Sequence, residues 1–170
     1  SRYLPGPYLT RILNDLGAEV VKVESPKGDP ARYTPPLTGR DSALFSSVNA
    51  GKRSIVIDLK QPSGVTLVRA LAAKSDIVVE SFRPGVATRL GIDYEQLSAL
   101  NPQLIMCSIT GFGQRGPLAS APGHDLNYIA RAGVLGLFGP PDAPPPVPGV
   151  QMADVAGGAL TASAGVLAAL

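Results

Sequence analysis

A histidine and an aspartate are the residues of this sequence best suited to moving a proton. His124 is the only histidine among 170 residues, and it stands in the segment APGHDLNYIARAG. Asp154 follows it by 30 positions. An imidazole titrates near neutral pH and can give or take a proton, and a carboxyl group can serve as an acid where burial raises its pKa. Only the fold can bring groups so far apart in the chain to one substrate.

Both residues also have a structural interpretation. His124 directly precedes an apolar stretch with helical periodicity, so it is also expected as a polar residue at a helix start, with Asp125 as a cap or a favourable charge there. Asp154 is favoured as the N-cap of a helix that runs through VAGGALTASAG. Gly157 and Gly158 each cost about 1 kcal/mol relative to alanine within a helix. We therefore expect something to pack close to that turn.

Helical and strand patterns alternate along the chain. Strands are expected at 18–24, 53–59, 75–82 and 103–110, and helices at 7–16, 64–74, 94–100 and 125–138, with a helical turn at 84–90 and a further helix from 154. The stretches 25–42 and 139–149 are expected to be a loop and a stiff proline-rich connection. Apolar strands separated by helices predict an α/β fold, a Rossmann-like, mostly parallel sheet with flanking helices.

Ligands of such sheets bind beyond the carboxyl ends of the strands. The segments VESP, IDLK, ESFRPG and SITGFGQRG occupy these ends. GFGQRG matches the dinucleotide fingerprint, but Pro117 follows it instead of a helix, so we interpret its glycines as a turn that passes close to another backbone or a ligand. Arg83 at one strand end, and Lys52, Arg53 and Lys60 around another strand, are either solvated surface or contacts to phosphate or adenine.

Composition limits the classes of partner. The chain is 45% apolar and 16% charged, which predicts a packed core, and a net charge of +2 without a basic run argues against nucleic acid. Cys107 is the single cysteine, which excludes an internal disulfide and favours the cytoplasm. The uncharged stretch 155–170 is too short and too rich in Gly, Ala and Ser for a membrane span, so we expect a buried helix and no membrane partner. No metal site is expected.

Five segments, taken in order, resemble the family III CoA transferases, the CaiB/BaiF group, which includes α-methylacyl-CoA racemase. They are GPYLTRILNDLGAEVVKVESPKGD, NAGKRSIVIDLK, SDIVVESFRPGVATRLGIDYEQLSALNPQLIMCSITGFGQRGP, PGHDLNYIARAG and VQMADVAGGALTASAGVLAAL. The likeness covers nearly the whole chain. It implies that residues 1–170 are one N-terminal CoA-binding, Rossmann-like domain, a fragment of a longer chain that carries further active-site groups.

Two chemistries follow from this resemblance. Transferases of the family attack the acyl-CoA with an aspartate that corresponds to Asp154, and racemases have in addition a histidine in a GHD-NY segment, which corresponds to His124. The racemase branch is the better match. It implies epimerisation of the α-carbon of a 2-methylacyl-CoA by 1,1-proton transfer through an enolate, in lipid metabolism. The alternative is a CoA transferase that forms an aspartyl intermediate at Asp154, and a third possibility is a non-catalytic CoA-binding or dimer-forming module.

The resemblance also implies the CoA contacts and the assembly. The expected contacts are Ile57, Asp58, Leu59, Lys60, Ser81, Phe82, Arg83, Arg89, Gly123, Asp125, Leu126, Asn127 and Tyr128. No cofactor is expected beyond the CoA of the acyl-CoA substrate, and the full-length protein is expected to form an interlaced homodimer. Some racemases carry an arginine near the CoA phosphates where this chain has Ser25, and Lys22, Lys27 or Arg32 are the candidates to replace it.

Overall fold

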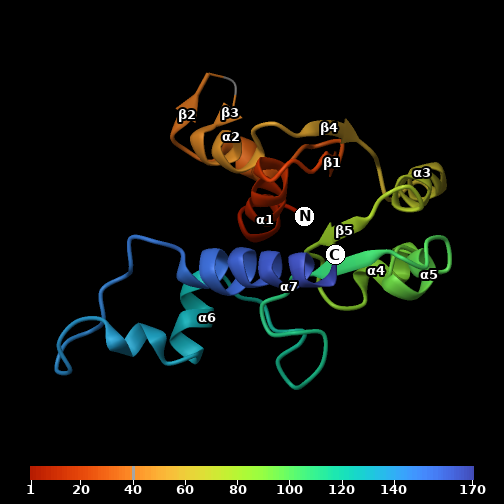
Figure 1. Ribbon diagram of the computed structural model, residues 1–170. Coiled ribbons are helices and arrows are strands. Elements are labelled where there is room, and N and C mark those ends of the chain that lie inside the picture. Colours follow the sequence, from red (N-terminus) through yellow and green to blue (C-terminus); the bar gives the residue numbers. More distant parts are fainter. Residues whose placement is uncertain (40) are drawn as a thin grey trace.

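Two pairs of parallel strands carry the fold, and helices pack around them (Figure 1). The computed structural model describes residues 1–39 and 41–170. In chain order its elements are α1 (Pro5–Asp15), β1 (Val21–Glu24), η1 (Pro30–Tyr33), β2 (Leu37–Thr38), β3 (Asp41–Ser42), α2 (Ala43–Asn49), β4 (Arg53–Val56), α3 (Pro62–Ala72), β5 (Ile77–Glu80), α4 (Val86–Leu90), α5 (Tyr94–Ser98), β6 (Ile105–Ser108), α6 (Asp125–Arg131), η2 (Val134–Leu137), η3 (Ala153–Leu160) and α7 (Thr161–Ala169).

The parallel pair β5–β6 is covered on both faces. Alternate side chains of its strands enter two different hydrophobic clusters. On one face Ile77, Val79 and Ile105 pack against α1, η3 and α7, whose buried residues are Leu9, Leu13, Ala159 and Val166. On the other face Val78 and Met106 pack with residues of α3 and of the segment that carries α4 and α5. Burial on both faces explains why these strands are apolar throughout.

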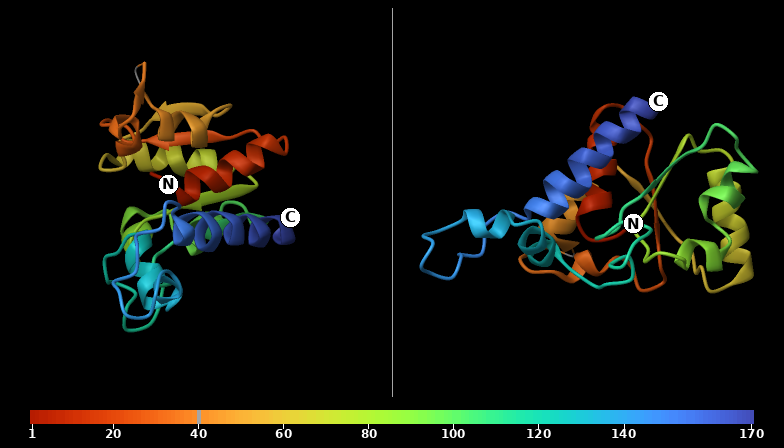
Figure 2. Two further views of the ribbon diagram at one scale, coloured as in Figure 1. Left: turned by 90° about the vertical axis from the view of Figure 1, so that its left-hand side faces the viewer. Right: turned by 90° about the horizontal axis from the view of Figure 1, so that it is seen from below.

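The second parallel pair, β1–β4, aligns Val21 with Arg53 and Glu24 with Val56. A hollow of about 180 Å³, lined by residues of β1 and β5 among others, lies between the two parallel pairs. The short strands β2 and β3 pair with each other in antiparallel fashion. The α/β class with parallel strands and flanking helices is confirmed, although the described residues pair as three two-stranded sheets rather than as one (Figure 2).

Ion pairs with buried carboxylates order the described residues of the segment 25–42, which the sequence predicts as a loop. The Arg32 guanidinium contacts Glu24 at 2.7 Å and Asp41 at 2.8 Å, and it lies 3.8 Å from the centre of the Phe45 ring. Lys22 pairs with a buried aspartate, Asp29, at 2.7 Å. This segment holds the short helix η1 and the paired strands β2 and β3. Lys22 and Glu24 of β1 supply the charges that fix η1, and α2 supplies the ring of Phe45.

Three helices differ from the expectation. The predicted helix 125–138 is broken, because Gly133 adopts a left-handed conformation between α6 and the 3₁₀ segment η2. Helix α2 was not predicted, although Ser42 accepts a hydrogen bond from the Leu44 N–H at 3.1 Å and is a good N-cap. The helix expected from 154 begins before that residue, and η3 is π-helical before it continues as α7.

Neither a membrane-spanning helix nor a cluster of metal ligands is present in the part of the chain that the structure describes. No helix there is both long enough and apolar enough to cross a bilayer. No three side chains of His, Cys, Asp or Glu are grouped there as a metal ion would require.

The Glu24–Arg32 pair predicts a specific loss of stability. We expect Arg32→Met to lower the free energy of unfolding by about 3 kcal/mol at neutral pH, because it leaves a buried carboxylate without its partner. The pairing with Arg32 is the largest cause that lowers the pKa of Glu24 from 4.5 to about 2, and hydrogen bonds from Ser54 and the Asp29 N–H lower it further. A lowered carboxyl pKa stabilises the fold above pH 4.5, and this contribution is lost as the pH falls through about 2.

The cost of Arg32→Met, measured by chemical denaturation of the intact protein, should therefore be largest above pH 4.5 and shrink toward pH 2. Arg53→Met is the matched control, since Arg53 pairs with Glu19 and both side chains are exposed. Exposed pairs contribute roughly 0–1 kcal/mol. An equal cost of the two substitutions would contradict this assignment.

Candidate functional site

His124 is the N-cap residue of α6. Its backbone N–H donates a hydrogen bond to the side-chain oxygen of Asn127 at 2.9 Å, and this fixes the first turn of the helix. The structural interpretation of His124 as a residue at a helix start is confirmed. The residue as a whole is exposed, so its placement as a cap leaves the imidazole open to a ligand.

Asp154 lies within a helix and is not its N-cap, so that part of the expectation was wrong. Met152 is the N-cap residue of η3, and Asp154 is the second residue of the segment. The backbone N–H of Asp154 has no partner inside its own helix at this position, and it donates to Asp125 Oδ1 at 2.9 Å. Asp125 thus caps η3, a helix that starts 28 positions further along the chain.

The Asp154 carboxyl is half-buried and responds to both residues at the start of α6. Burial raises its pKa above the usual value, and the negative charge of Asp125 raises the pKa further. The charge of His124 lowers it. The helices α6 and η3 pack against each other. The bond between Asp125 and the Asp154 N–H and the charge interaction of His124 with Asp154 bring the two helix starts together.

The Tyr128 side chain packs against the GFGQRG turn and interacts with Asp154. Its hydroxyl donates to the Gly123 carbonyl at 2.6 Å, and burial and the charge of Asp154 both raise its pKa. Phe112 packs edge-on against its ring at 5.1 Å. A Cβ at Gly111, the first residue of GFGQRG, would lie 2.4 Å from the ring. The glycine therefore allows a turn that packs closely on α6, and the neighbour of this turn is the Tyr128 side chain rather than the backbone or ligand that the sequence predicts.

The residues expected to contact CoA at strand ends fall into three groups. Ile57 is buried, whereas Leu59 and Phe82 are partly buried and pack in the cluster on the α3 side of β5–β6. Lys60, Arg83 and Arg89 are exposed. The remaining two are half-buried and have local partners: Asp58 accepts from the Lys60 N–H at 3.0 Å, and the hydroxyl of Ser81 lies 3.3 Å from that of Ser1.

The other expected CoA contacts, Gly123 and Asp125 to Tyr128, surround the start of α6. Leu126 and Asn127 are exposed, whereas Gly123, Asp125 and Tyr128 are half-buried. These residues therefore adjoin His124 and Asp154. The strand-end group follows β4 and β5 and belongs to other elements.

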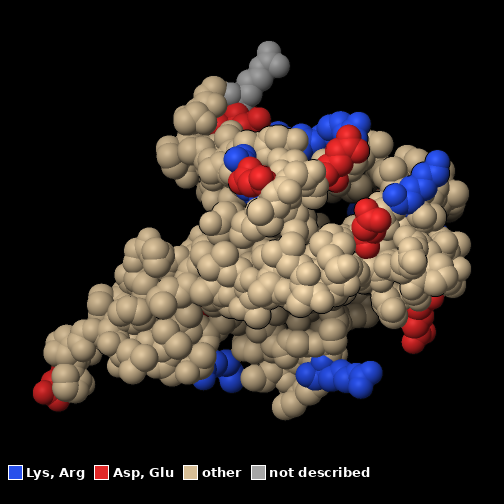
Figure 3. Space-filling view, in the orientation of Figure 1, with Lys and Arg blue, Asp and Glu red and all other residues tan. Residues whose placement is uncertain are grey.

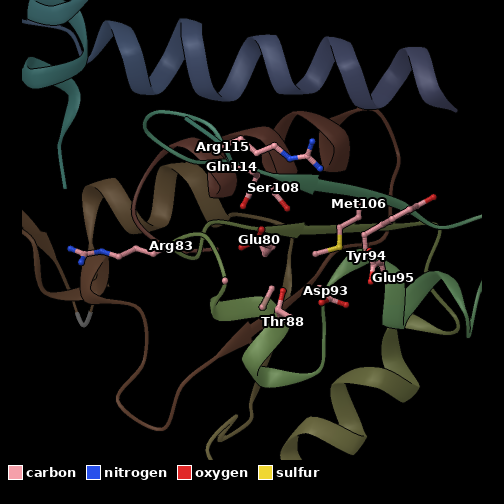
Figure 4. A pocket seen from close by; sticks show the side chains of 12 residues that line it. Glu80, Arg83, Thr88, Asp93, Tyr94, Glu95, Met106, Ser108, Gln114 and Arg115 are labelled. Carbon is pink, nitrogen blue, oxygen red and sulfur yellow. The ribbon is translucent and has the colours of Figure 1, made fainter. Parts of the chain in front are cut away.

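A hollow of about 480 Å³ opens beyond β5 and β6 (Figure 4). Arg83 lines it, together with Arg115, which comes from the GFGQRG turn and was not singled out from the sequence. Glu80, Asp93 and Glu95 contribute acidic groups to the same hollow. Of the expected CoA contacts only Arg83 lines this hollow, and neither His124 nor Asp154 does.

Several basic residues that could replace an arginine at Ser25 are already engaged. Lys22 and Arg32 are held in ion pairs with buried carboxylates. Lys52 donates to the Pro7 and Val48 carbonyls, both at 2.7 Å, and thereby joins α1 to α2. Lys27 is exposed and is the remaining candidate of the three, and Arg40, another basic residue of this region, lies outside the described residues.

The whole chain, residues 1–170, matches the model of CoA-transferase family III. The chain belongs to this family. A crystal structure of a CaiB/BaiF family protein from Brucella suis superposes with a TM-score of 0.95 at 44% identity, covering 99% of this chain and 46% of that one. The parallel pairs and the helix starts of the candidate site are thus those of a family III fold.

Curated relatives of the family III chain include both chemistries. Succinyl-CoA:glutarate CoA-transferase of Mus musculus is 44% identical over 160 residues, which cover 93% of this chain and 37% of the relative. Alpha-methylacyl-CoA racemase of Homo sapiens is 41% identical over 170 residues, which cover 100% of this chain and 41% of the relative. The chain thus spans about two fifths of the length of these relatives.

The raised pKa of Asp154 predicts that this carboxyl opposes folding at neutral pH. An ionised group that is more costly in the folded state lowers stability above its folded pKa, and the cost vanishes below its ordinary value of 3.8. We expect Asp154→Asn to raise the melting temperature at pH 7 and to lose this advantage at pH values below 3.8. Asp142→Asn, on the exposed loop, should not change the melting temperature at either pH. A lower melting temperature of the Asp154 variant at pH 7 would contradict the assignment.

Proposed function

We propose that the protein containing this chain is an acyl-CoA racemase, in which His124 and Asp154 exchange the α-proton of a 2-methylacyl-CoA. The observation that carries the proposal is the meeting of the starts of α6 and η3, where His124 acts on the pKa of Asp154. One group would remove the proton from one face of the carbon, and the other would return a proton to the opposite face. The electrons of the broken C–H bond pass through an enolate oxygen and return to carbon in the second step.

The electrostatics of the pair suit this reaction. Burial and Asp125 raise the pKa of Asp154, which brings the carboxyl closer to a state in which it can donate a proton. His124 is exposed at the start of α6, and an imidazole can act as either an acid or a base. Racemisation runs in both directions, so each group must be able to give and to take a proton.

The CoA moiety would be held mainly by exposed cations and by backbone. Lys60, Arg83 and Arg89 are exposed, and their positive charges suit the phosphates of CoA. Phe82 and Leu59 keep those strand ends in place through the core, so their contribution is to position backbone groups. The proposal needs no cofactor beyond the CoA of the substrate.

A CoA transferase is the second candidate, and the similarity to succinyl-CoA:glutarate CoA-transferase favours it. The Asp154 carboxylate would attack the acyl carbonyl and expel the CoA thiolate, leaving a mixed anhydride. The thiolate would then attack the aspartyl carbonyl of the anhydride, which releases the first carboxylate and leaves an aspartyl-CoA thioester. An acceptor carboxylate reverses these steps. In this reaction His124 is not required to move the α-proton.

We also propose that the C-terminal part of the chain contacts a second copy in an interlaced homodimer. Residues 132–170 contain only two charged side chains, Asp142 and Asp154. Figure 3 shows no charged group over the central face formed by α7. The exposed leucines Leu160, Leu167 and Leu170 support an interface there, since contiguous exposed apolar surface usually marks a contact. The cytoplasm and lipid metabolism remain the compartment and the process that we propose.

Isotope exchange in the intact protein separates the two reactions. A single epimer of a 2-methylacyl-CoA in D₂O should take up deuterium at the α-carbon and lose its stereochemical purity. We expect His124→Ala and Asp154→Asn each to reduce this exchange by about 10²–10⁴-fold, the range typical of a removed acid or base. The measurement is mass spectrometry together with chiral chromatography.

Transfer of CoA to an added carboxylate without α-deuterium would instead support the transferase. In that case hydroxylamine should trap an acyl adduct at Asp154, and His124→Ala should leave transfer intact. Binding of CoA without either reaction would contradict both candidates and leave a CoA-binding module.

The two glycines of η3 give a second test, because the structure separates their roles. A Cβ at Gly158 would lie 2.8 Å from the Cβ of Pro5, whereas a Cβ at Gly157 would meet nothing within 4 Å. We expect Gly158→Ala to destabilise the fold, since overpacking costs about 1–3 kcal/mol and a helical Gly→Ala change regains only about 1 kcal/mol. Gly157→Ala should leave stability unchanged or raise it.

Gly157 nevertheless lies on the exposed side of the turn that carries Asp154. If the thioester approaches this turn, Gly157→Ala should raise the KM for acyl-CoA while thermal unfolding shows an intact fold. Unchanged kinetics of Gly157→Ala would show that the thioester approaches elsewhere.

A further inference from the structure

Asp125 joins the two helix starts that carry the proposed acid and base. It is the first residue of α6, directly after His124, and its Oδ1 accepts the Asp154 backbone N–H at 2.9 Å. Met152, the N-cap residue of η3, makes no side-chain capping bond. Asp125, a residue of α6, therefore supplies the capping hydrogen bond from another helix. No other side-chain hydrogen bond joins α6 to η3 among the described residues.

We propose that Asp125 is a positioning residue, whose carboxylate holds the first turn of η3 so that Asp154 stays opposite His124. This inference rests on the proposed function, and it assigns to Asp125 a role other than the CoA contact expected from the sequence. His124 is itself fixed through Asn127, which accepts its N–H at 2.9 Å. The geometry of the pair therefore depends on one bond within α6 and on one bond between α6 and η3.

A helix start that loses its cap frays, and the displaced residue here is the one that must reach the substrate. A misplacement of about 1 Å at a reacting group can cost up to about 100-fold in rate. An asparagine at 125 keeps an oxygen that can accept the Asp154 N–H, but it lacks the charge. An alanine removes both. The two variants therefore separate the hydrogen bond from the charge.

The charge of Asp125 has its own signature in the pH profile. Among the described residues, the charges that shift the pKa of Asp154 are those of Asp125 and His124, both from the start of α6, and Tyr128 of α6 interacts with it in turn. The helices α1 and α7, which also pack against η3, add no such charge. Removal of the Asp125 charge lowers the pKa of Asp154, so the acidic limb that reports ionised Asp154 should move to lower pH in both variants.

The test uses the intact protein and the reaction established by the isotope experiment. We expect Asp125→Ala to lower kcat by up to about 100-fold with little change in KM, and Asp125→Asn to retain most of kcat. Ser42→Ala is the matched control, since it removes the side-chain cap of α2, away from the site, and should lower stability without changing kcat.

Hydrogen exchange of the Asp154 amide gives a readout that needs no turnover. This amide should exchange slowly in the wild type and in Asp125→Asn, and faster in Asp125→Ala. Faster exchange with unchanged kcat would overturn the positioning role while leaving the proposed function intact. A raised KM with unchanged kcat, or an equal loss of kcat in both variants, would also overturn it. The proposed function fails separately, if Asp154→Asn and His124→Ala remain fully active.

Discussion

The hydrogen bond from the Asp154 N–H to the Asp125 carboxylate is the contact on which the candidate site depends. His124 and Asp154 belong to different helices and are 30 positions apart, so no local rule relates them. Each has an ordinary role at a helix start. The bond of 2.9 Å between the two starts turns these separate features into one arrangement.

The same packing that supports η3 also prepares its chemistry. Ala159 is fully buried against α1, and Gly158 lies where a larger residue would meet Pro5. This contact holds η3 on the layer formed by α1 and the β5–β6 pair. Because the helix is held against this layer, Asp154 is half-buried, and burial is the main cause of its raised pKa. The packing of η3 on this layer thus both supports the helix and favours the proton chemistry proposed for Asp154.

Much of the architecture could be predicted from periodicity. The apolar runs of β5 and β6 predicted strands covered on both faces, and the two clusters around them confirm it. The order of the segment 25–42 could not be predicted, because it depends on the pairing of Arg32 with Glu24 across the loop. The break at Gly133 was likewise hidden, since a glycine within an apolar pattern does not by itself indicate a left-handed conformation.

The candidate site was predictable in its residues more than in its geometry. His124 and Asp154 stood out by type, and the structure places them together. The role of Asp125 could not be predicted, because a capping carboxylate is normally sought beside its own helix. The burial of Ile57 and the partial burial of Leu59 and Phe82 could not be predicted, since a resemblance carries over positions but not the surroundings of side chains.

The most direct test of the account is a crystal structure of the intact protein with an unreactive thioether analogue of a 2-methylacyl-CoA. The account predicts that the α-carbon lies between the imidazole of His124 and the carboxyl of Asp154, with one group on each face. An α-carbon that contacts only one of them, or an acyl chain bound away from the starts of α6 and η3, would contradict it.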